Sequence, residues 1–294
     1  MLISCTRLKA IRLIKLFFLV TILAWPAEVQ AQEAPIRLII RSDDMGFSHA
    51  ANHAMIETYE KGITTSVEIM VPTPWFPEAV RLLKEHPDLD VGIHITLTSE
   101  WSNVKWRPLT KAPGLADEDG YFFPMIWPNS NYGPEQALRE QEWTLEEVEA
   151  EMRAQIETAL HHLPHISHLS AHMGCTSMAP EVEEVYRKLS AEYGLDIHPE
   201  DLGVKRARYA GPTDTPALKR QSFINMLRQL TPGTYLFVDH PAYDVPEVRG
   251  IHHTGYEDVA VDRQGVTNIL TDPEVIQLIK DLQIDLVSYA DLKK

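Results

Sequence analysis

Apolar positions along the chain follow two periods, one typical of strands and one typical of helices. Short β-branched or alternating runs predict strands at residues 36–41, 65–71, 90–97, 166–170, 195–198, 234–239 and 284–288. Helical spacing, bounded by capping residues, prolines or glycines, predicts helices at residues 48–61, 77–85, 144–163, 180–193, 216–230 and 273–282. This alternation favours a parallel sheet covered by helices. We therefore expect an α/β fold of one domain, a TIM-like and irregular (β/α) barrel.

The segment from residue 99 to 143 interrupts the alternation. It is rich in tryptophan, tyrosine, proline, asparagine and glycine. A long connection inside a compact domain is usually functional or disordered, and so many aromatic side chains argue against disorder. The pattern predicts a long, aromatic-rich insertion loop.

The first 31 residues are typical of a secretory signal peptide. Four basic residues precede or border an apolar core at 16–24, and Val29 and Ala31 suit cleavage after residue 31. The apolar core is short for a membrane span. We expect an exported protein, periplasmic or secreted, with its catalytic domain at residues 32–294 and no stable membrane insertion after cleavage. A retained N-terminal anchor is the alternative.

The charge balance narrows the range of partners. The chain has 27 basic and 42 acidic residues, and removal of the signal would leave a net charge of −18. Such an acidic surface argues against binding to nucleic acid or anionic lipid. It leaves a neutral or cationic substrate open, and the sequence also leaves a homodimer open.

Acidic residues and histidines lie in or just after several predicted strands, where parallel α/β barrels collect their reactive groups. The sequence places Asp44 after the first strand, His94 late in the third, and His168 and His172 in and after the fourth. Carboxylate oxygens and imidazole nitrogens suit a divalent metal ion. Three protein ligands would leave positions for a water and a substrate oxygen. The pattern indicates a metal-dependent hydrolase.

Two further residues suit proton transfer. If Asp44 binds the metal ion, Asp43 can deprotonate the attacking water. Pro241 restricts the backbone of His240 to extended forms, and this imidazole can protonate a leaving group. Each residue also has a structural explanation: Asp43-Asp44 before Gly46 suits a turn, and single histidines are often only hydrogen-bonded.

Cys175 is the one cysteine that remains after removal of the signal, so an intrachain disulfide is excluded. It lies three residues beyond His172, which leaves a nucleophilic role open. We interpret it instead as a small buried residue.

Four motifs in this order resemble those of the YdjC/ChbG family of carbohydrate deacetylases. They are Asp-Asp-Met-Gly-Phe-Ser at 43–48, Val-Gly-Ile-His-Ile-Thr-Leu-Thr at 91–98, His-Leu-Ser-Ala-His-Met-Gly at 168–174 and Phe-Val-Asp-His-Pro at 237–241. The similarity covers roughly residues 36–292. It implies a distorted (β/α) barrel that hydrolyses N-acetyl groups of amino-sugar oligosaccharides and releases acetate.

The resemblance also implies roles for single residues. Asp44, His94 and His172 would hold one divalent metal ion, with Mg²⁺ or Zn²⁺ favoured, and His168 would be a partner or an additional ligand. Asp43 would be the general base, and His240 the general acid or the group that stabilises the oxyanion. These roles match those that the residue types suggest by themselves.

Three points remain open from the sequence. Ser170 stands where the family usually has Asp, so a carboxylate that orients a ligating histidine is missing at that position. Trp101 and Trp106 could stack on sugar rings or could simply pack the loop. The alternatives for function are hydrolysis of another amide or ester, and a carbohydrate-binding relative without turnover.

Overall fold

Seven parallel strands form one sheet within residues 34–293, the part of the chain that the computed structural model describes. The strands are β1 (Ile36–Met45), β2 (Ser66–Ile69), β3 (Asp90–Ile95), β4 (His168–Ala171), β5 (Lys205–Arg206), β6 (Gly233–Asp239) and β7 (Ile284–Leu286). Their order is β4-β3-β2-β1-β6-β5, and β7 pairs with the start of β1. The outer strands β4 and β5 do not pair with each other among the described strands. The expected irregular barrel is therefore confirmed, and it is open between these two strands.

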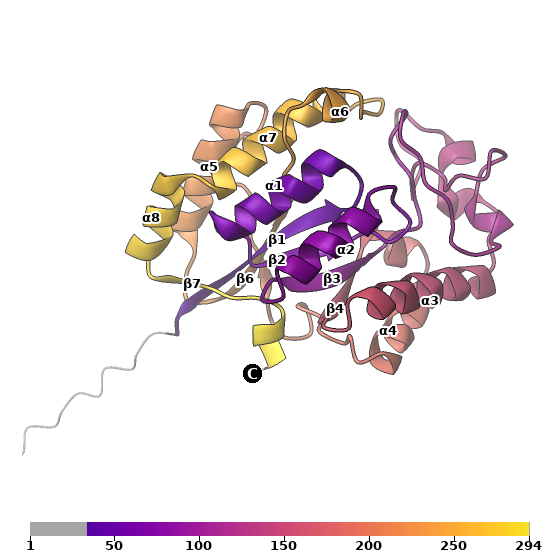
Figure 1. Ribbon diagram of the computed structural model, residues 1–294, viewed down its shortest axis with the longest axis horizontal. Coiled ribbons are helices and arrows are strands. Elements are labelled where there is room, and N and C mark those ends of the chain that lie inside the picture. The colour runs from indigo at the N-terminus through magenta and orange to yellow at the C-terminus, as the bar shows by residue number, and fades with distance from the viewer. Residues whose placement is uncertain (1–33, 294) are drawn as a thin grey trace, which may run out of the picture. The chain divides into compact units, whose positions relative to one another are not determined.

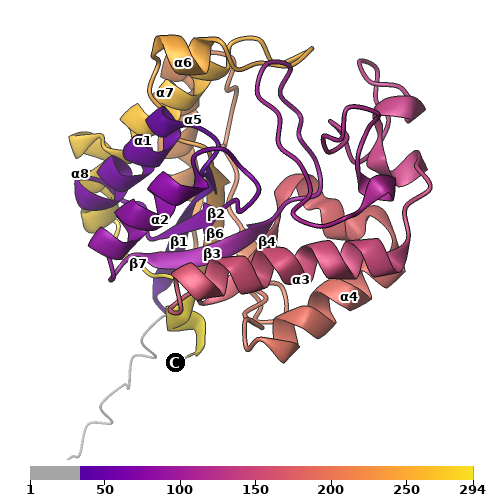
Figure 2. The same ribbon diagram turned by 45° about the vertical axis from the view of Figure 1, so that its right-hand side comes forward.

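Helices cover the curled sheet (Figures 1 and 2). They are α1 (His49–Glu60), α2 (Phe76–Glu85), α3 (Leu145–His162), α4 (Pro180–Glu192), α5 (Pro216–Gln229), α6 (Pro246–Arg249), α7 (Val259–Leu270) and α8 (Pro273–Asp281). Local chemistry starts several of them. Thr144 and Glu147 form the reciprocal hydrogen bonds of a capping box before α3, and the Ser48 side chain caps α1. None of the described helices has the length and apolar character that a membrane crossing requires.

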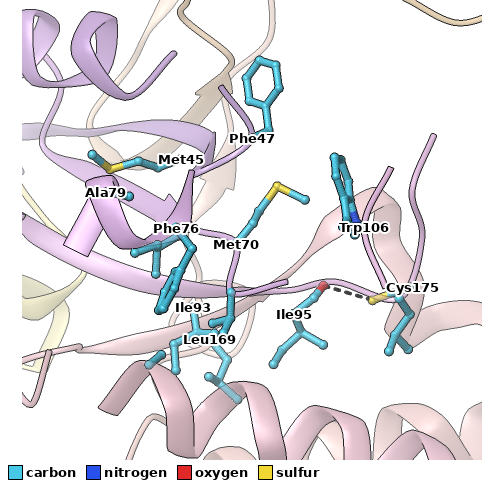
Figure 3. Close-up of a cluster of buried hydrophobic side chains, with 14 of the residues drawn as sticks. Met45, Phe47, Met70, Phe76, Ala79, Ile93, Ile95, Trp106, Leu169 and Cys175 are labelled. Carbon is cyan, nitrogen blue, oxygen red and sulfur yellow. Dashed lines mark hydrogen bonds between the residues drawn. The ribbon is translucent and has the colours of Figure 1, made fainter. Parts of the chain in front are cut away.

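The hydrophobic core lies between the sheet and the helices. Figure 3 shows Met45, Met70, Phe76 and Leu169 meeting in this layer. Cys175 belongs to the same core, and its Sγ donates to the carbonyl of Ile95. Burial raises the pKa of this thiol to about 12. The interpretation of Cys175 as a buried structural residue is confirmed.

The long segment from 99 to 143 packs against helix α3. It contains three short 3₁₀ turns: η1 (Pro113–Leu115), η2 (Pro134–Gln136) and η3 (Leu138–Glu140). Glu151 of α3 is fully buried and accepts hydrogen bonds from the backbone of Leu109 and Thr110. Satisfied backbone groups of this kind allow a connection without regular structure to pack against a helix.

One predicted strand is wrong. Residues 195–198 form no strand, although Leu195 and Ile197 are buried and alternate with polar residues. The backbone N–H of Leu195 donates to the carbonyl of Ser190, and the Ser190 hydroxyl donates to the carbonyl of Leu195. The strand of this region is β5, seven residues further on, and it follows the turn after Pro199. Helices α6 and α7 were not expected, and α7 contributes a residue to the candidate site.

Candidate functional site

The carboxyl end of β1 bulges at the two adjacent aspartates. The register of β1 against β2 shifts between Ser42 and Met45, and Asp44 has a φ of 70°. A non-glycine residue in this left-handed region costs energy and is common at functional sites. The Asn52 side chain accepts from the backbone N–H of Gly46 at 2.7 Å, which fixes the turn that follows. The bulge aims Asp43 and Asp44 at the histidines of β3 and of the segment after β4.

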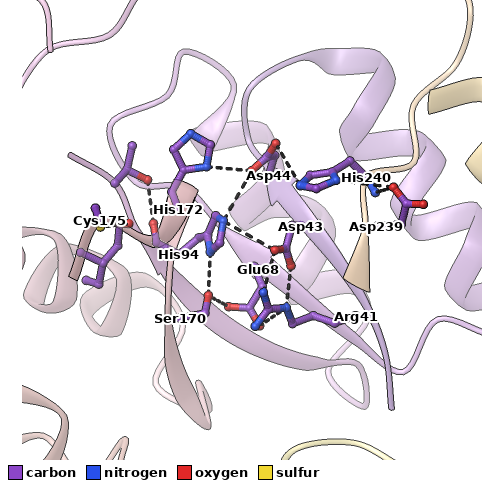
Figure 4. A network of polar contacts seen from close by, with 12 residues as sticks. Arg41, Asp43, Asp44, Glu68, His94, Ser170, His172, Cys175, Asp239 and His240 are labelled. Atoms are coloured by element: carbon purple, nitrogen blue, oxygen red, sulfur yellow. Dashed lines mark hydrogen bonds and ion pairs between the residues drawn. The ribbon is translucent and has the colours of Figure 1, made fainter. Parts of the chain in front are cut away.

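Asp44, His94 and His172 converge at this end of the sheet (Figure 4). Asp44 Oδ1 lies 3.5 Å from His94 Nε2 and 3.2 Å from His172 Nδ1. One ligand atom from each residue lies within 4.8 Å of the other two, and all three side chains are buried. Asp44 Oδ1 forms no well-aligned hydrogen bond, which is unusual for a buried carboxylate oxygen. One carboxylate and two imidazoles fit a divalent cation, and a cation would also satisfy that oxygen.

The pKa values within this triad differ from those of the free side chains. Burial, together with the neighbouring His172, lowers the pKa of His94 to about 3, so its ring is neutral and can offer a nitrogen lone pair. For His172, burial acts in the opposite direction to Glu100 and Asp44, which prevail and raise its pKa to about 10. The Asp44 carboxyl is stabilised in its charged form, because His240 and His172 outweigh its burial and lower its pKa.

Asp43 lies beside the triad and is held by Arg41. Its Oδ2 is 2.7 Å from Arg41 Nη2 and 3.7 Å from His94 Nε2. Arg41 Nε lies 2.7 Å from the other carboxylate oxygen, so the guanidinium holds Asp43 in a two-point contact. Arg41 also donates to the hydroxyl of Tyr289. The Asp43 carboxylate is therefore fixed in direction next to the triad.

His240 follows β6 and approaches Asp44 from another strand. Its Nε2 lies 3.7 Å from Asp44 Oδ2, and 36% of its side chain is exposed. Burial of the ring is outweighed by Asp44 and by the hydrogen bond with Asp239, which raise the pKa of His240. Its side chain is more exposed than those of the triad, so it is better placed to meet a molecule that enters from solvent.

His168 is not part of the triad. It is buried, its ring stacks on Tyr289 at a centroid distance of 3.6 Å, and its Nε2 bonds to Glu68 Oε1 at 2.6 Å. Glu68 is fully buried as well. Burial is outweighed by His168 and Arg41, which lower the pKa of Glu68 and keep it ionised. His168 therefore belongs with the residues that surround the triad.

Three residues around the triad were not predicted from the sequence, namely Glu68, Glu100 and Arg263. Glu100 accepts from His172 Nε2 at 3.0 Å, on the side of the ring that faces away from Asp44. Arg263 of α7 donates from Nη2 to Asp44 Oδ2 at 3.1 Å. Glu100 lies three residues past the predicted strand at 90–97, which was a usable signal. Arg263 lies 219 residues from Asp44, and nothing local marks it.

Trp101 and Trp106 are each only 2% exposed, and neither offers a free ring face to a sugar. Trp101 stacks on His253, and the Arg263 guanidinium lies over its ring at 5.2 Å. The indole N–H of Trp106 donates to the carbonyl of Thr98. Of the two roles considered for these residues, the structure agrees with packing of the loop.

Fold and site together define an open parallel (β/α) barrel with a buried aspartate and two histidines at the carboxyl ends of its strands. The chain belongs to the family of YdjC-like proteins, which matches residues 37–281.

Similar proteins support this assignment. A carbohydrate deacetylase of Thermus thermophilus is 35% identical over 239 residues, which are 73% of this chain and 80% of that protein. A carbohydrate deacetylase of Thermoanaerobacter pseudethanolicus is 29% identical over 87% of this chain and 99% of its own length. The fold resembles a crystal structure from Enterococcus faecalis V583, of a protein named for cellobiose-phosphate cleavage. It has a TM-score of 0.68 and 24% identity, and the match covers 88% of this chain and 99% of that one.

Proposed function

We propose that this protein is a metal-dependent deacetylase that removes N-acetyl groups from amino-sugar oligosaccharides and releases acetate. The observation that carries the proposal is the buried triad of Asp44, His94 and His172 with Asp43 fixed beside it. The curated relatives named carbohydrate deacetylases support the substrate class. Two imidazoles in the ligand set favour Zn²⁺ over Mg²⁺, which prefers oxygen ligands.

The residues divide the reaction between them. Asp44, His94 and His172 would hold a metal ion, which would supply Lewis-acid chemistry to the amide carbonyl and to a water molecule. Asp43 accepts the proton of the water that attacks the carbonyl carbon, and Arg41 keeps that carboxylate aimed during the transfer. His240 donates a proton to the amine nitrogen as the C–N bond breaks. The products are acetate and a free amino sugar.

The test combines metal analysis with acetate release from N-acetylglucosamine oligomers. Asp43→Asn should retain the metal ion of the wild type and lose turnover by roughly 10²–10⁴-fold, the usual contribution of a general base. His172→Ala should lower the metal content. Full turnover in Asp43→Asn would show that Asp43 is not the general base. Full metal content in His172→Ala would show that His172 is not a metal ligand.

A matched control separates these losses from general damage. His198 is a buried imidazole that bonds to Ser190 and lies outside the triad. His198→Ala should keep both metal content and turnover. An equal loss in His198→Ala and His172→Ala would attribute the effect to folding.

We also propose that the protein is exported. The basis is the signal-like sequence of residues 1–31, which lies outside the described residues.

A further inference from the structure

A buried series of hydrogen bonds starts at His94, on the side of its ring that faces away from Asp44 (Figure 4). His94 Nδ1 lies 2.6 Å from Ser170 Oγ. The Ser170 hydroxyl donates to Glu68 Oε2, and His168 Nε2 donates to Glu68 Oε1. These four side chains are all buried. A carboxylate thus reaches the far side of a triad histidine through one hydroxyl group.

The register of the sheet explains why these residues meet. Glu68 of β2 pairs with Gly92 of β3, and Gly92 pairs with His168 of β4. Two residues further along, His94 pairs with Ser170. Because side chains repeat every two residues, all of these positions share one face of the sheet. Gly92 contributes no side chain to that face, so Glu68 can extend across β3 and reach both His168 and Ser170.

Gly92 is required for this arrangement. A Cβ atom at that position would lie 2.5 Å from His168 Nε2 and 2.7 Å from Glu68 Oε1, far inside van der Waals contact. The backbone of Gly92 is not in the left-handed region, so its conformation does not call for glycine. Glycine is needed because Glu68 and His168 leave no room for a side chain at this position.

We propose that Glu68 is a positioning residue, which acts through the Ser170 hydroxyl to hold the His94 ring in the orientation that a metal ion needs. The inference rests on the proposed function only in taking His94 as a ligand. Glu68 does not touch the triad itself. It supplies the carboxylate that the resemblance places at position 170, from β2 instead of β4.

Proton counting gives the direction of the series. Ser170 has one hydroxyl proton, and the ionised Glu68 takes it in a charge-assisted bond. The Ser170 oxygen can then only accept from His94, so Nδ1 carries the proton of that ring. His94 Nε2, which faces Asp44 at 3.5 Å, is left with its lone pair. Glu68 therefore sets the tautomer of His94, although the two residues are connected only through two hydrogen bonds and the Ser170 hydroxyl.

The experiment measures Zn²⁺ affinity by calorimetry and the melting temperature (Tm) of each full-length variant. Loss of a group that orients a ligating histidine typically weakens metal binding by about 10–100-fold. Glu68→Gln and Ser170→Ala should both show a loss of this size. Glu68→Gln with Ser170→Asp returns a carboxylate to the position beside His94 and should recover most of the affinity. Ser170→Asp alone places two carboxylates together and should lower Tm.

Glu151→Gln is the control, because Glu151 is an equally buried carboxylate that bonds to the loop backbone and to Gln155. It should lower Tm and leave Zn²⁺ affinity unchanged. If Glu68→Gln does not fold, Ser170→Ala and the double variant carry the test.

The outcomes separate the two proposals. Absence of Zn²⁺ binding to the wild type would contradict the proposed function. Wild-type binding with unchanged affinity in Ser170→Ala and Glu68→Gln would overturn the positioning role. Loss in Glu68→Gln without recovery in the double variant would overturn it too, because Glu68 would then act only as part of the packing.

Discussion

Replacement of Gly92 by alanine tests how tightly the three strands under the site are packed. The added methyl group would enter the space between Glu68 and His168, where the nearest atoms lie 2.5–2.7 Å away or closer. Neither side chain can move away without losing its contacts. The His168 ring is stacked on Tyr289, with an angle of 6° between the ring planes, and Glu68 is bonded at both oxygens.

The expected cost follows from two terms. Overpacking of a buried site costs about 1–3 kcal/mol. Separation of the ionised Glu68 from His168 removes a charged hydrogen bond, worth about 1.5–3 kcal/mol. Together they lower the free energy of unfolding by roughly 2.5–6 kcal/mol. In a domain of this size, each kcal/mol shifts Tm by about 2–4 °C, so Tm should fall by roughly 5–24 °C.

Thermal unfolding followed by circular dichroism measures this shift, with Gly250→Ala as the matched control. Gly250 has a φ of −83°, and a Cβ there would meet its nearest atom, the Glu247 carbonyl oxygen, at 3.4 Å. Its free energy of unfolding should change by no more than about 0.5 kcal/mol. Equal melting temperatures for the two alanine variants would refute the rigid packing of Glu68 against His168.

Two further predictions concern residues away from the triad. In a Cys5→Ser background, Cys175 should react with a thiol reagent at pH 8 at least about 100-fold more slowly in the native than in the denatured protein, because it is buried and its pKa is about 12; comparable rates would contradict its burial. Thr144→Ala removes the capping box of α3 and should cost about 1 kcal/mol, seen as a Tm lower by about 2–4 °C. An unchanged Tm would show that the packing of α3, and not its cap, fixes the start of that helix.

The sequence predicted most of the fold because its signals are local. Thr144 with Glu147 predicts the start of α3, and an apolar run such as 234–239 predicts β6 closely. The exception is the strand predicted at 195–198. Leu195 and Ile197 alternate as in a strand, but the backbone groups of Leu195 are hydrogen-bonded to Ser190 and not to a neighbouring strand. A hydrophobic pattern reports which side chains are buried. It does not report which backbone groups pair, and only pairing makes a strand.

The same limit applies to the candidate site. Asp43, Asp44, His94 and His240 could be grouped from the sequence, because strand ends of a parallel barrel face one side. Arg263 and Glu68 could not. Their places depend on which strands and helices are neighbours, and strand order is not a local property of the chain. For Trp101 the sequence left sugar stacking and loop packing open, and in the structure the ring is buried and lies against the Arg263 guanidinium.

Ser170 shows why a departure from a family motif has to be judged in three dimensions. Taken alone, serine at this position removes a charge, and that left a relative without turnover open as an alternative. The physical requirement is weaker than the motif: an acceptor must face His94 Nδ1, and a carboxylate must fix the proton of that acceptor. Ser170 and Glu68 meet it jointly, provided that position 92 has no side chain. Three positions that look unrelated along the chain, 68, 92 and 170, therefore depend on one another. A change at any one of them should be tolerated only together with a change at another.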